Sequence, residues 1–151
     1  MYNDVSVDEE NLARPGDLLF AWSGSLTVRR WFRPEAIVNQ HIFKVIPNDG
    51  VPIWFVHGAV LQLLDFFRGI AADKATTMGH IQRHHLDEEV LVPPTERLQE
   101  LDRWCGALWR RALAAEEENL VLSDLRDTLL PKLLSGKLRV RDAESLVETT
   151  L

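Results

Sequence analysis

Cysteine is almost absent from this sequence of 151 residues, since Cys105 is the only one. A single thiol cannot form a disulfide within the chain, which excludes a disulfide-stapled extracellular fold and fits a reducing compartment. Long apolar runs are also lacking. The most apolar stretch, residues 51–67, is interrupted by His57, Gln62 and Asp65, and it falls short of the ~20 residues that a membrane span needs. We therefore expect a cytoplasmic protein that does not associate with a membrane.

Motifs for nucleotide chemistry are missing as well. The chain has no Walker-type phosphate loop and no dinucleotide-binding fingerprint. His80, His84 and His85 lie close together, but no cysteine or acid pair with zinc-ligand spacing accompanies them. A hydrolase that uses His80 or His84 would also need a nucleophile or an acid, and we find none placed to serve it. We therefore expect no catalytic residue, no metal and no cofactor.

Positive charge is scarce overall, because the net charge is −6. Its distribution is uneven. Residues 1–17 hold five acids and one base, residues 18–86 hold seven bases and four acids, and residues 87–151 hold nine bases and fourteen acids. All five histidines also lie in the middle segment. A basic segment between acidic flanks can attract phosphate locally, although the whole chain is acidic.

Short apolar runs separated by turn residues fill the first third of the chain and predict strands. A later stretch has apolar residues at helical spacing and predicts a helix that crosses these strands. The expected elements are strands at 18–22, 27–32, 36–46 and 89–92, a helix at 52–72 and a polar loop at 74–85.

The clearest periodicity begins at Thr95, a suitable N-cap, and ends before Pro131, which we expect to halt the helix. A helix over residues 95–130 would be about 54 Å long, more than a domain of this size can cover with its own core. We therefore expect a coiled-coil-type seam that pairs with another long helix. The alternative is an ordinary amphipathic helix packed on its own domain. The seam residues are Leu98, Leu101, Cys105, Leu108, Ala112, Ala115, Asn119, Leu122 and Leu129.

Five motifs in a fixed order resemble those of the specificity subunits of type I restriction–modification enzymes. They are GDLLFAWSGSL at 16–26, NQHIFKV at 39–45, KATTMGHIQRHHL at 74–86, VPP at 92–94 and LRDTLLPKLLSG at 125–136. The first three resemble strands and a loop of the family's target recognition domain. The fourth lies where the family passes into its long spacer helix, and the fifth is similar to the end of that helix.

The resemblance implies an α+β fold, with a small, mostly β target recognition module followed by a long coiled-coil-type α-helix. Residues 1–92 would be the C-terminal portion of a recognition domain whose N-terminal part is missing. Residues 93–136 would be the conserved spacer helix and residues 137–151 a C-terminal tail. In the family, two such units pair their helices antiparallel and set the distance between two DNA half-sites.

Candidate DNA contacts fall in two places. Arginine suits guanine, glutamine suits adenine, and hydroxyls and cations suit phosphate. The loop beside Gly79 concentrates such groups, and a second basic cluster adjoins Trp31. For the arginines, the alternative is a solvated turn. For Thr76 to Gly79, the alternative is a structural loop that braces the domain on its helix. The candidates are Arg29, Arg30, Arg33, Lys74, Thr76, Thr77, His80, Gln82, Arg83 and His84.

We therefore predict a non-catalytic, sequence-specific DNA-binding subunit, or half of one, that reads one half-site on double-stranded DNA. The resemblance implies that the methyltransferase and the ATP-driven translocase-nuclease are partner subunits, which this chain would scaffold. We also expect a homodimer, or pairing with another specificity-subunit half through the long helix. The alternative function is a coiled-coil assembly module that has lost DNA binding.

Overall fold

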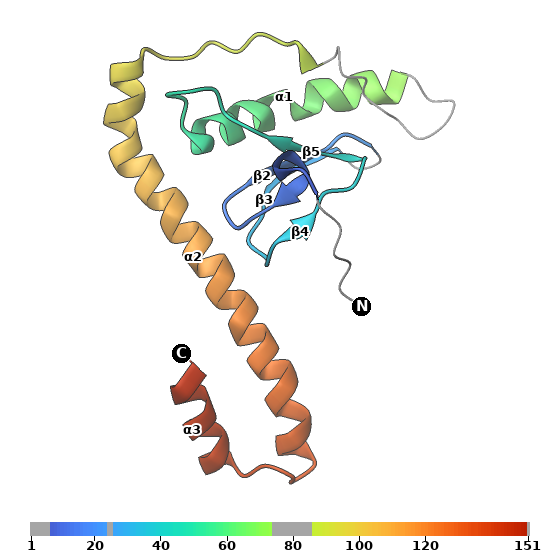
Figure 1. Ribbon diagram of the computed structural model, residues 1–151, viewed down its shortest axis with the longest axis vertical. Coiled ribbons are helices and arrows are strands. Elements are labelled where there is room, and N and C mark those ends of the chain that lie inside the picture. The colour runs from blue at the N-terminus through green and yellow to red at the C-terminus, as the bar shows by residue number, and fades with distance from the viewer. Residues whose placement is uncertain (1–6, 24–25, 74–85, 151) are drawn as a thin grey trace. The chain divides into compact units, whose positions relative to one another are not determined.

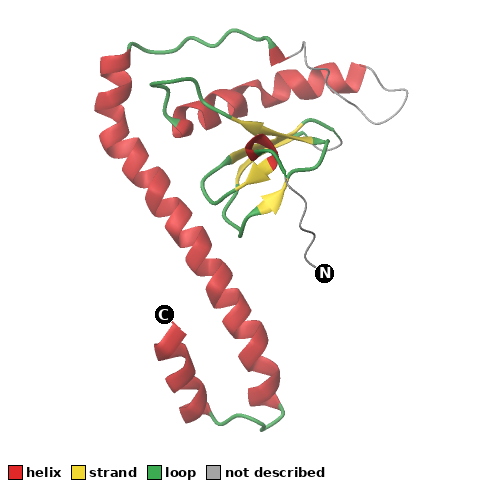
Figure 2. Cartoon of the chain, in the orientation of Figure 1, coloured by secondary structure: helices red, strands yellow, loops and turns green. Residues whose placement is uncertain are grey.

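The computed structural model describes residues 7–23, 26–73 and 86–150. The chain divides into two compact units, Met1–Leu113 and Ala114–Leu151, and the predicted α+β class is confirmed (Figures 1 and 2). The described elements, in chain order, are η1 (Glu9–Asn11), β1 (Leu12–Ala13), β2 (Leu18–Ala21), β3 (Thr27–Arg30), β4 (Ala36–Ile37), β5 (Ile42–Val45), α1 (Ile53–Asp73), α2 (Thr95–Leu134) and α3 (Val140–Thr150).

A three-stranded antiparallel sheet with the order β3–β2–β5 forms the centre of the first unit. Across β2 and β3, Leu18 pairs with Arg30 and Phe20 pairs with Val28. On the other side of β2, Phe20 pairs with Phe43 of β5. Successive residues of a strand point to opposite faces, so Leu18, Phe20 and Val28 share one face of the sheet, and all three are buried.

Helix α1 covers this apolar face. Its Leu64, Phe67 and Ala71 are buried in the same core cluster as Leu18 and Phe20, and the rings of Phe20 and Phe67 lie 6.0 Å apart. The helix over 52–72 was predicted from the spacing of Phe55, Ala59, Leu63 and Phe67, and that prediction is confirmed. Of these four residues only Phe67 belongs to the buried row. Burying a side chain of this size contributes about 1.5–3 kcal/mol.

By length and composition alone, α1 is apolar enough to cross a membrane. The sequence did not lead us to expect this. Core helices of soluble proteins pass the same test, and the row Leu64, Phe67 and Ala71 is buried against the sheet. The finding is therefore weak evidence for a membrane.

Two expected strands differ in the structure. The run 36–46 is divided into β4, which pairs with β1, and β5, which pairs with β2. The division falls where Asn39 accepts a hydrogen bond from the backbone N–H of His41 at 2.9 Å, which turns the chain. The predicted strand at 89–92 is wrong: this segment is extended but belongs to no sheet, and Leu91 is 96% exposed. A short apolar run needs a ladder partner, and the described chain offers none there.

Helix α2 also continues past its predicted end. Pro131 lies inside it, and the helix ends at Leu134. A proline removes one backbone donor and crowds the carbonyl four residues before it, but one more turn forms after Pro131, with Ser135 N–H donating to the Pro131 carbonyl at 3.1 Å. Gly136, with φ +69°, then takes the left-handed conformation that commonly ends a helix. The expected tail contains α3, where Ala143 is buried.

The core makes a simple prediction about stability. Phe67→Ala should lower the free energy of unfolding by about 3–5 kcal/mol, because it leaves a cavity between α1 and the sheet. Urea denaturation followed by circular dichroism measures the change. Phe66→Ala is the matched control, since Phe66 is 47% exposed. Equal losses in the two variants would contradict the proposed core.

Candidate functional site

The three arginines of the predicted basic cluster do not share one surface. Arg29 lies on β3 and is exposed, and Arg33 is exposed with its guanidinium carbon 5.6 Å from the Phe32 ring centroid. Arg30 is turned the other way, as alternation along a strand requires. Its Nη1 donates to the backbone carbonyl of Trp109 at 2.8 Å, and its guanidinium carbon lies 4.3 Å from the centroid of that indole.

The turn that carries Arg33 is held by backbone and indole hydrogen bonds. The hairpin continues past β3, because Trp31 N–H donates to the Asp17 carbonyl at 2.7 Å and Gly16 N–H donates to the Trp31 carbonyl at 2.8 Å. The Trp31 indole N–H then donates to the Pro34 carbonyl at 3.0 Å. Arg33 therefore projects from a braced turn.

The second set of candidates falls between α1 and Leu86, in the segment 74–85. Leu86 packs against the core cluster, and Asp73 ends α1, so both flanks of this segment are anchored on the module. The candidates themselves lie outside the described residues: Lys74, Thr76, Thr77, His80, Gln82, Arg83 and His84. The described ranges, which also leave out His85, bring no three His, Cys, Asp or Glu side chains together as a metal site.

The first two family-like motifs meet in space, because their strands, β2 and β5, are neighbours. The Trp22 indole N–H donates to the Gln40 carbonyl at 3.1 Å, and the Trp22 backbone N–H donates to the His41 carbonyl at 3.2 Å. The Trp22 ring also stacks on Phe43, with 5.8 Å between ring centroids. These motif residues therefore join two strands, as well as lying near one end of the sheet.

Several other cations of the module are engaged by carboxylates. Arg14 is held by Glu9 at 2.6 Å and by Glu35 at 2.8 Å, and its hydrogen bond lowers the pKa of Glu9. The partly buried Lys44 pairs with Asp17 at 2.8 Å. Positive charge is thus locally neutralised at Arg14 and Lys44, whereas Arg29 and Arg33 are the exposed members of the predicted cluster.

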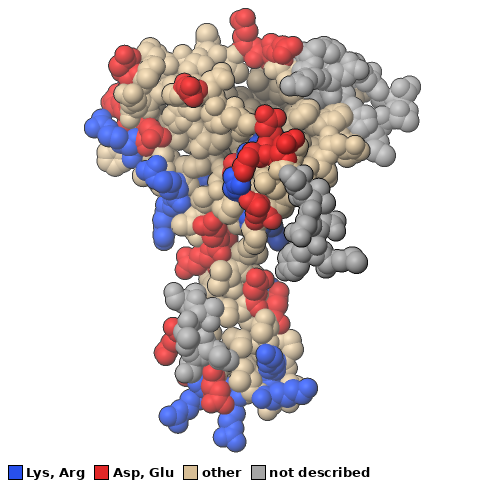
Figure 3. All heavy atoms as spheres, viewed as in Figure 1, with Lys and Arg blue, Asp and Glu red and all other residues tan. Residues whose placement is uncertain are grey.

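Space-filling atoms show how the charges are distributed on one face (Figure 3). Acidic and basic side chains are interspersed over the first unit, whereas Lys and Arg gather at the end of the second unit where α2 is followed by α3. Lys132, Lys137 and Arg139 belong to that stretch. This basic end was not among the predicted DNA contacts.

The predicted helix seam has two environments in the first unit. Leu98 is only 2% exposed, and Leu101 and Cys105 are partly buried, whereas Leu108 is 70% exposed and Ala112 is also exposed. Beside Leu108, Trp104 is 75% exposed. In the second unit the seam is mixed: Asn119 and Leu122 are exposed, and Ala115 and Leu129 are partly buried.

A second face of α2, which shares only Leu98 with the predicted seam, packs on the module. It carries residues spaced by three or four positions: Leu98, Asp102, Gly106, Trp109 and Leu113. Asp102 accepts a hydrogen bond from the Trp54 indole N–H at 2.7 Å, and the Trp109 indole lies 5.1 Å from the His57 ring. The sequence contains this spacing, but the neighbouring apolar seam is the more regular pattern and was predicted instead.

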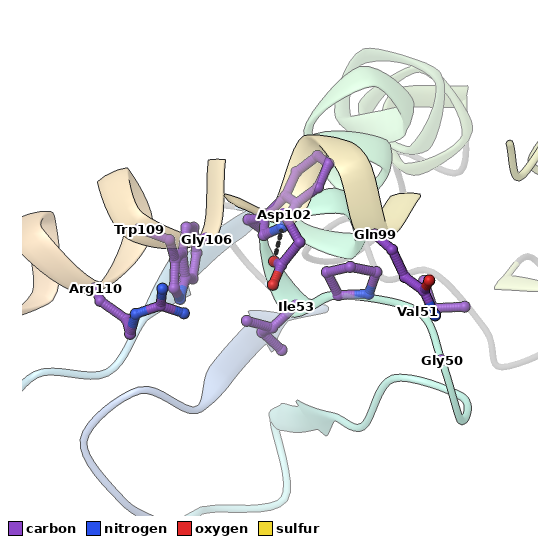
Figure 4. A pocket seen from close by; sticks show the side chains of 10 residues that line it. Gly50, Val51, Ile53, Gln99, Asp102, Gly106, Trp109 and Arg110 are labelled. Atoms are coloured by element: carbon purple, nitrogen blue, oxygen red, sulfur yellow. Dashed lines mark hydrogen bonds between the residues drawn. The ribbon is translucent and has the colours of Figure 1, made fainter. Parts of the chain in front are cut away.

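A cleft of about 540 Å³ opens beside this contact. Gly50, Val51 and Ile53 line it from the module, and Gln99, Asp102 and Arg110 line it from α2 (Figure 4). The cleft contains a carboxylate that is already hydrogen-bonded and an exposed guanidinium, but no nucleophile with a base beside it. Its chemistry is that of a packing boundary between helix and module.

Two curated proteins are similar to this chain. The Haemophilus influenzae protein described as "Type I restriction enzyme HindI specificity subunit" is 24% identical over 102 residues, which cover 66% of this chain and 22% of that protein. The Methanocaldococcus jannaschii protein described as "Type I restriction enzyme MjaIX specificity subunit" is 30% identical over 70 residues, which cover 46% of this chain and 16% of that protein. No protein-family model and no solved structure matches the chain.

The chain thus spans about a fifth of the length of these relatives, or less. Their descriptions confirm the resemblance that the five motifs indicated.

Proposed function

From its similarity to a part of type I restriction enzyme specificity subunits, we propose that this chain is a non-catalytic fragment or half of such a subunit. It reads one half-site on double-stranded DNA in the cytoplasm and scaffolds the methyltransferase and the translocase-nuclease. The observation that carries the proposal is the pair of relatives, both described as specificity subunits. The joining of two family-like motifs through Trp22 and β5 supports it.

The mechanism is binding without bond-making. Arg29 and Arg33 supply exposed cations that attract phosphate and orient the module on the duplex. Base discrimination belongs to the candidates at 74–85, above all Gln82 and Arg83, where a good bidentate pair is worth about 1–3 kcal/mol. No cofactor is required of this chain, because methyl transfer and cleavage take place on the partner subunits.

Helix pairing is the second part of the proposal. Leu108 and Trp104 are largely exposed on α2, and Leu122 is 41% exposed farther along the same helix. Large apolar side chains in a row at helical spacing favour a second helix as their partner. That helix comes from a second copy or from another specificity-subunit half, so two weak modules gain affinity by acting together.

A specific observation favours the alternative function, an assembly module that does not bind DNA. The net charge is −6, and carboxylates already engage Arg14 and Lys44. An assembly module would keep the exposed stripe on α2 and have no affinity for a duplex. The two functions therefore differ in one measurable property, the dependence of DNA binding on salt.

DNA binding should weaken linearly with the logarithm of salt concentration, because neutralised phosphates release counterions. The slope of log binding constant against log salt concentration is about −0.9 per phosphate neutralised, so replacing Arg29 and Arg33 together by alanine should make this slope shallower by about two. Fluorescence anisotropy with a random duplex measures it. Arg97→Ala is the control, since Arg97 already pairs with Glu100 on α2. No binding of the unaltered chain even at low salt would favour the assembly function.

Leu108→Glu should disrupt self-association, because pairing of the helices would bury a carboxylate without a partner. Sedimentation velocity at micromolar concentration should show an association at least about tenfold weaker, a loss of about 1.4 kcal/mol. Leu122→Glu should act in the same direction. Ala107→Glu is the matched control, because Ala107 is exposed and lies off the seam. A monomeric unaltered chain, or equal effects of both charges, would contradict helix pairing.

A further inference from the structure

The side chain of Arg30 joins the sheet to α2. Its hydrogen bond to the Trp109 carbonyl and its position 4.3 Å from the indole centroid engage the backbone and the ring of one residue. The His57 ring of α1 packs beside the same indole, with 5.1 Å between the ring centroids. A guanidinium over an aromatic face adds electrostatic attraction to such packing. Trp109 is therefore held from both β3 and α1.

Two helical turns earlier, α2 is held a second time. The Trp54 indole N–H donates to Asp102 Oδ1 at 2.7 Å in a partly buried contact (Figure 4). Gly106 makes room for that carboxylate, because a Cβ at this position would lie 2.5 Å from Oδ1 and 2.9 Å from Cγ of Asp102. Glycine weakens a helix interior, and here it permits a hydrogen bond to the module.

The two contacts lie on one face of α2, and Leu98 is buried on the same face. Two separated attachments fix the rotation of a helix about its axis, which a single contact does not. Leu108 and Trp109 are consecutive, so their side chains diverge by about 100° around the helix. Holding Trp109 against the module therefore keeps Leu108 pointing away from it, in agreement with its exposure of 70%.

We propose that Arg30 and Gly106 are positioning residues, which lock α2 in the rotation that presents the Leu108 stripe outward. Arg30 acts through Trp109, and Gly106 acts through the hydrogen bond between Asp102 and Trp54. Arg30 is then not a phosphate contact, unlike its neighbour Arg29. The use of the outward-facing Leu108 rests on the proposed function, whereas the orientation of α2 rests on the contacts themselves.

Gly106→Ala tests the lock without a loss of helix propensity, because alanine is the better helix former. The Trp54 indole N–H signal in a ¹⁵N-correlated NMR spectrum, assigned with Trp54→Phe, should shift. The backbone amides of residues 102–113 should exchange with solvent about tenfold faster, since local opening of the contact becomes easier. Gly58→Ala is the matched control, because a Cβ at this helical glycine of α1 meets nothing within 4 Å.

Variants of Arg30 and Arg29 distinguish a positioning residue from a phosphate contact. Arg30→Ala should shift the Trp109 indole signal and speed amide exchange on α2, but leave the salt slope of DNA binding unchanged. Arg29→Ala should reduce that slope by about 0.9 and leave the Trp109 signal in place. Arg30→Lys keeps the charge without the planar guanidinium, so it should still shift the Trp109 signal, and it serves if the alanine variant fails to fold.

The outcomes separate the two proposals. An unchanged Trp54 signal in Gly106→Ala, or a shallower salt slope in Arg30→Ala, would overturn the lock. An absence of DNA binding by every protein, together with the expected NMR shifts, would overturn DNA reading and leave the lock standing.

Discussion

The pairing of Leu18 with Arg30 across β2 and β3 decides which arginine faces the helices. Because side chains alternate along a strand, this register places Val28 in the core, lets Arg30 reach Trp109 and leaves Arg29 exposed. A slip by one residue would exchange the roles of all three. Burial of Leu18 and Val28 against α1 resists that slip, so hydrophobic packing determines which arginine of β3 is exposed.

The same packing explains how much of the fold the sequence predicts. An apolar run of strand length identifies β2, and turn residues on both sides indicate β3. The spacing of Phe55, Ala59, Leu63 and Phe67 identifies α1, because one apolar face suffices to produce the pattern, although the buried row is Leu64, Phe67 and Ala71. Periodicity says little about segments without a buried face. The segment at 89–92 is mostly apolar but has no ladder in the described chain, and α2 continues for three residues beyond Pro131.

The candidate site is less predictable for a related reason. Helix α2 carries two apolar stripes, one through Leu101 and Leu108 and one through Trp109 and Leu113, and a sequence alone does not state which of them its own module covers. Gly106 lies on the covered face, where a Cβ would meet the Asp102 carboxylate that the Trp54 indole binds. Strand alternation likewise separates Arg29 from Arg30, but only after the core face of β3 is known.

The weak positive charge of the module and the exposed apolar side chains of α2 are related in the proposed function. Exposed arginines such as Arg29 and Arg33 neutralise few phosphates, and a chain of net charge −6 gains little from long-range attraction. If the chain reads a half-site as proposed, it would hold DNA firmly only when a second module is bound to the same duplex. Under the proposed function, joining two modules requires a surface that the first one leaves uncovered, and the exposed Leu108 would lie on that surface. The proposed rotation of α2 would therefore link the affinity for DNA to the geometry of assembly.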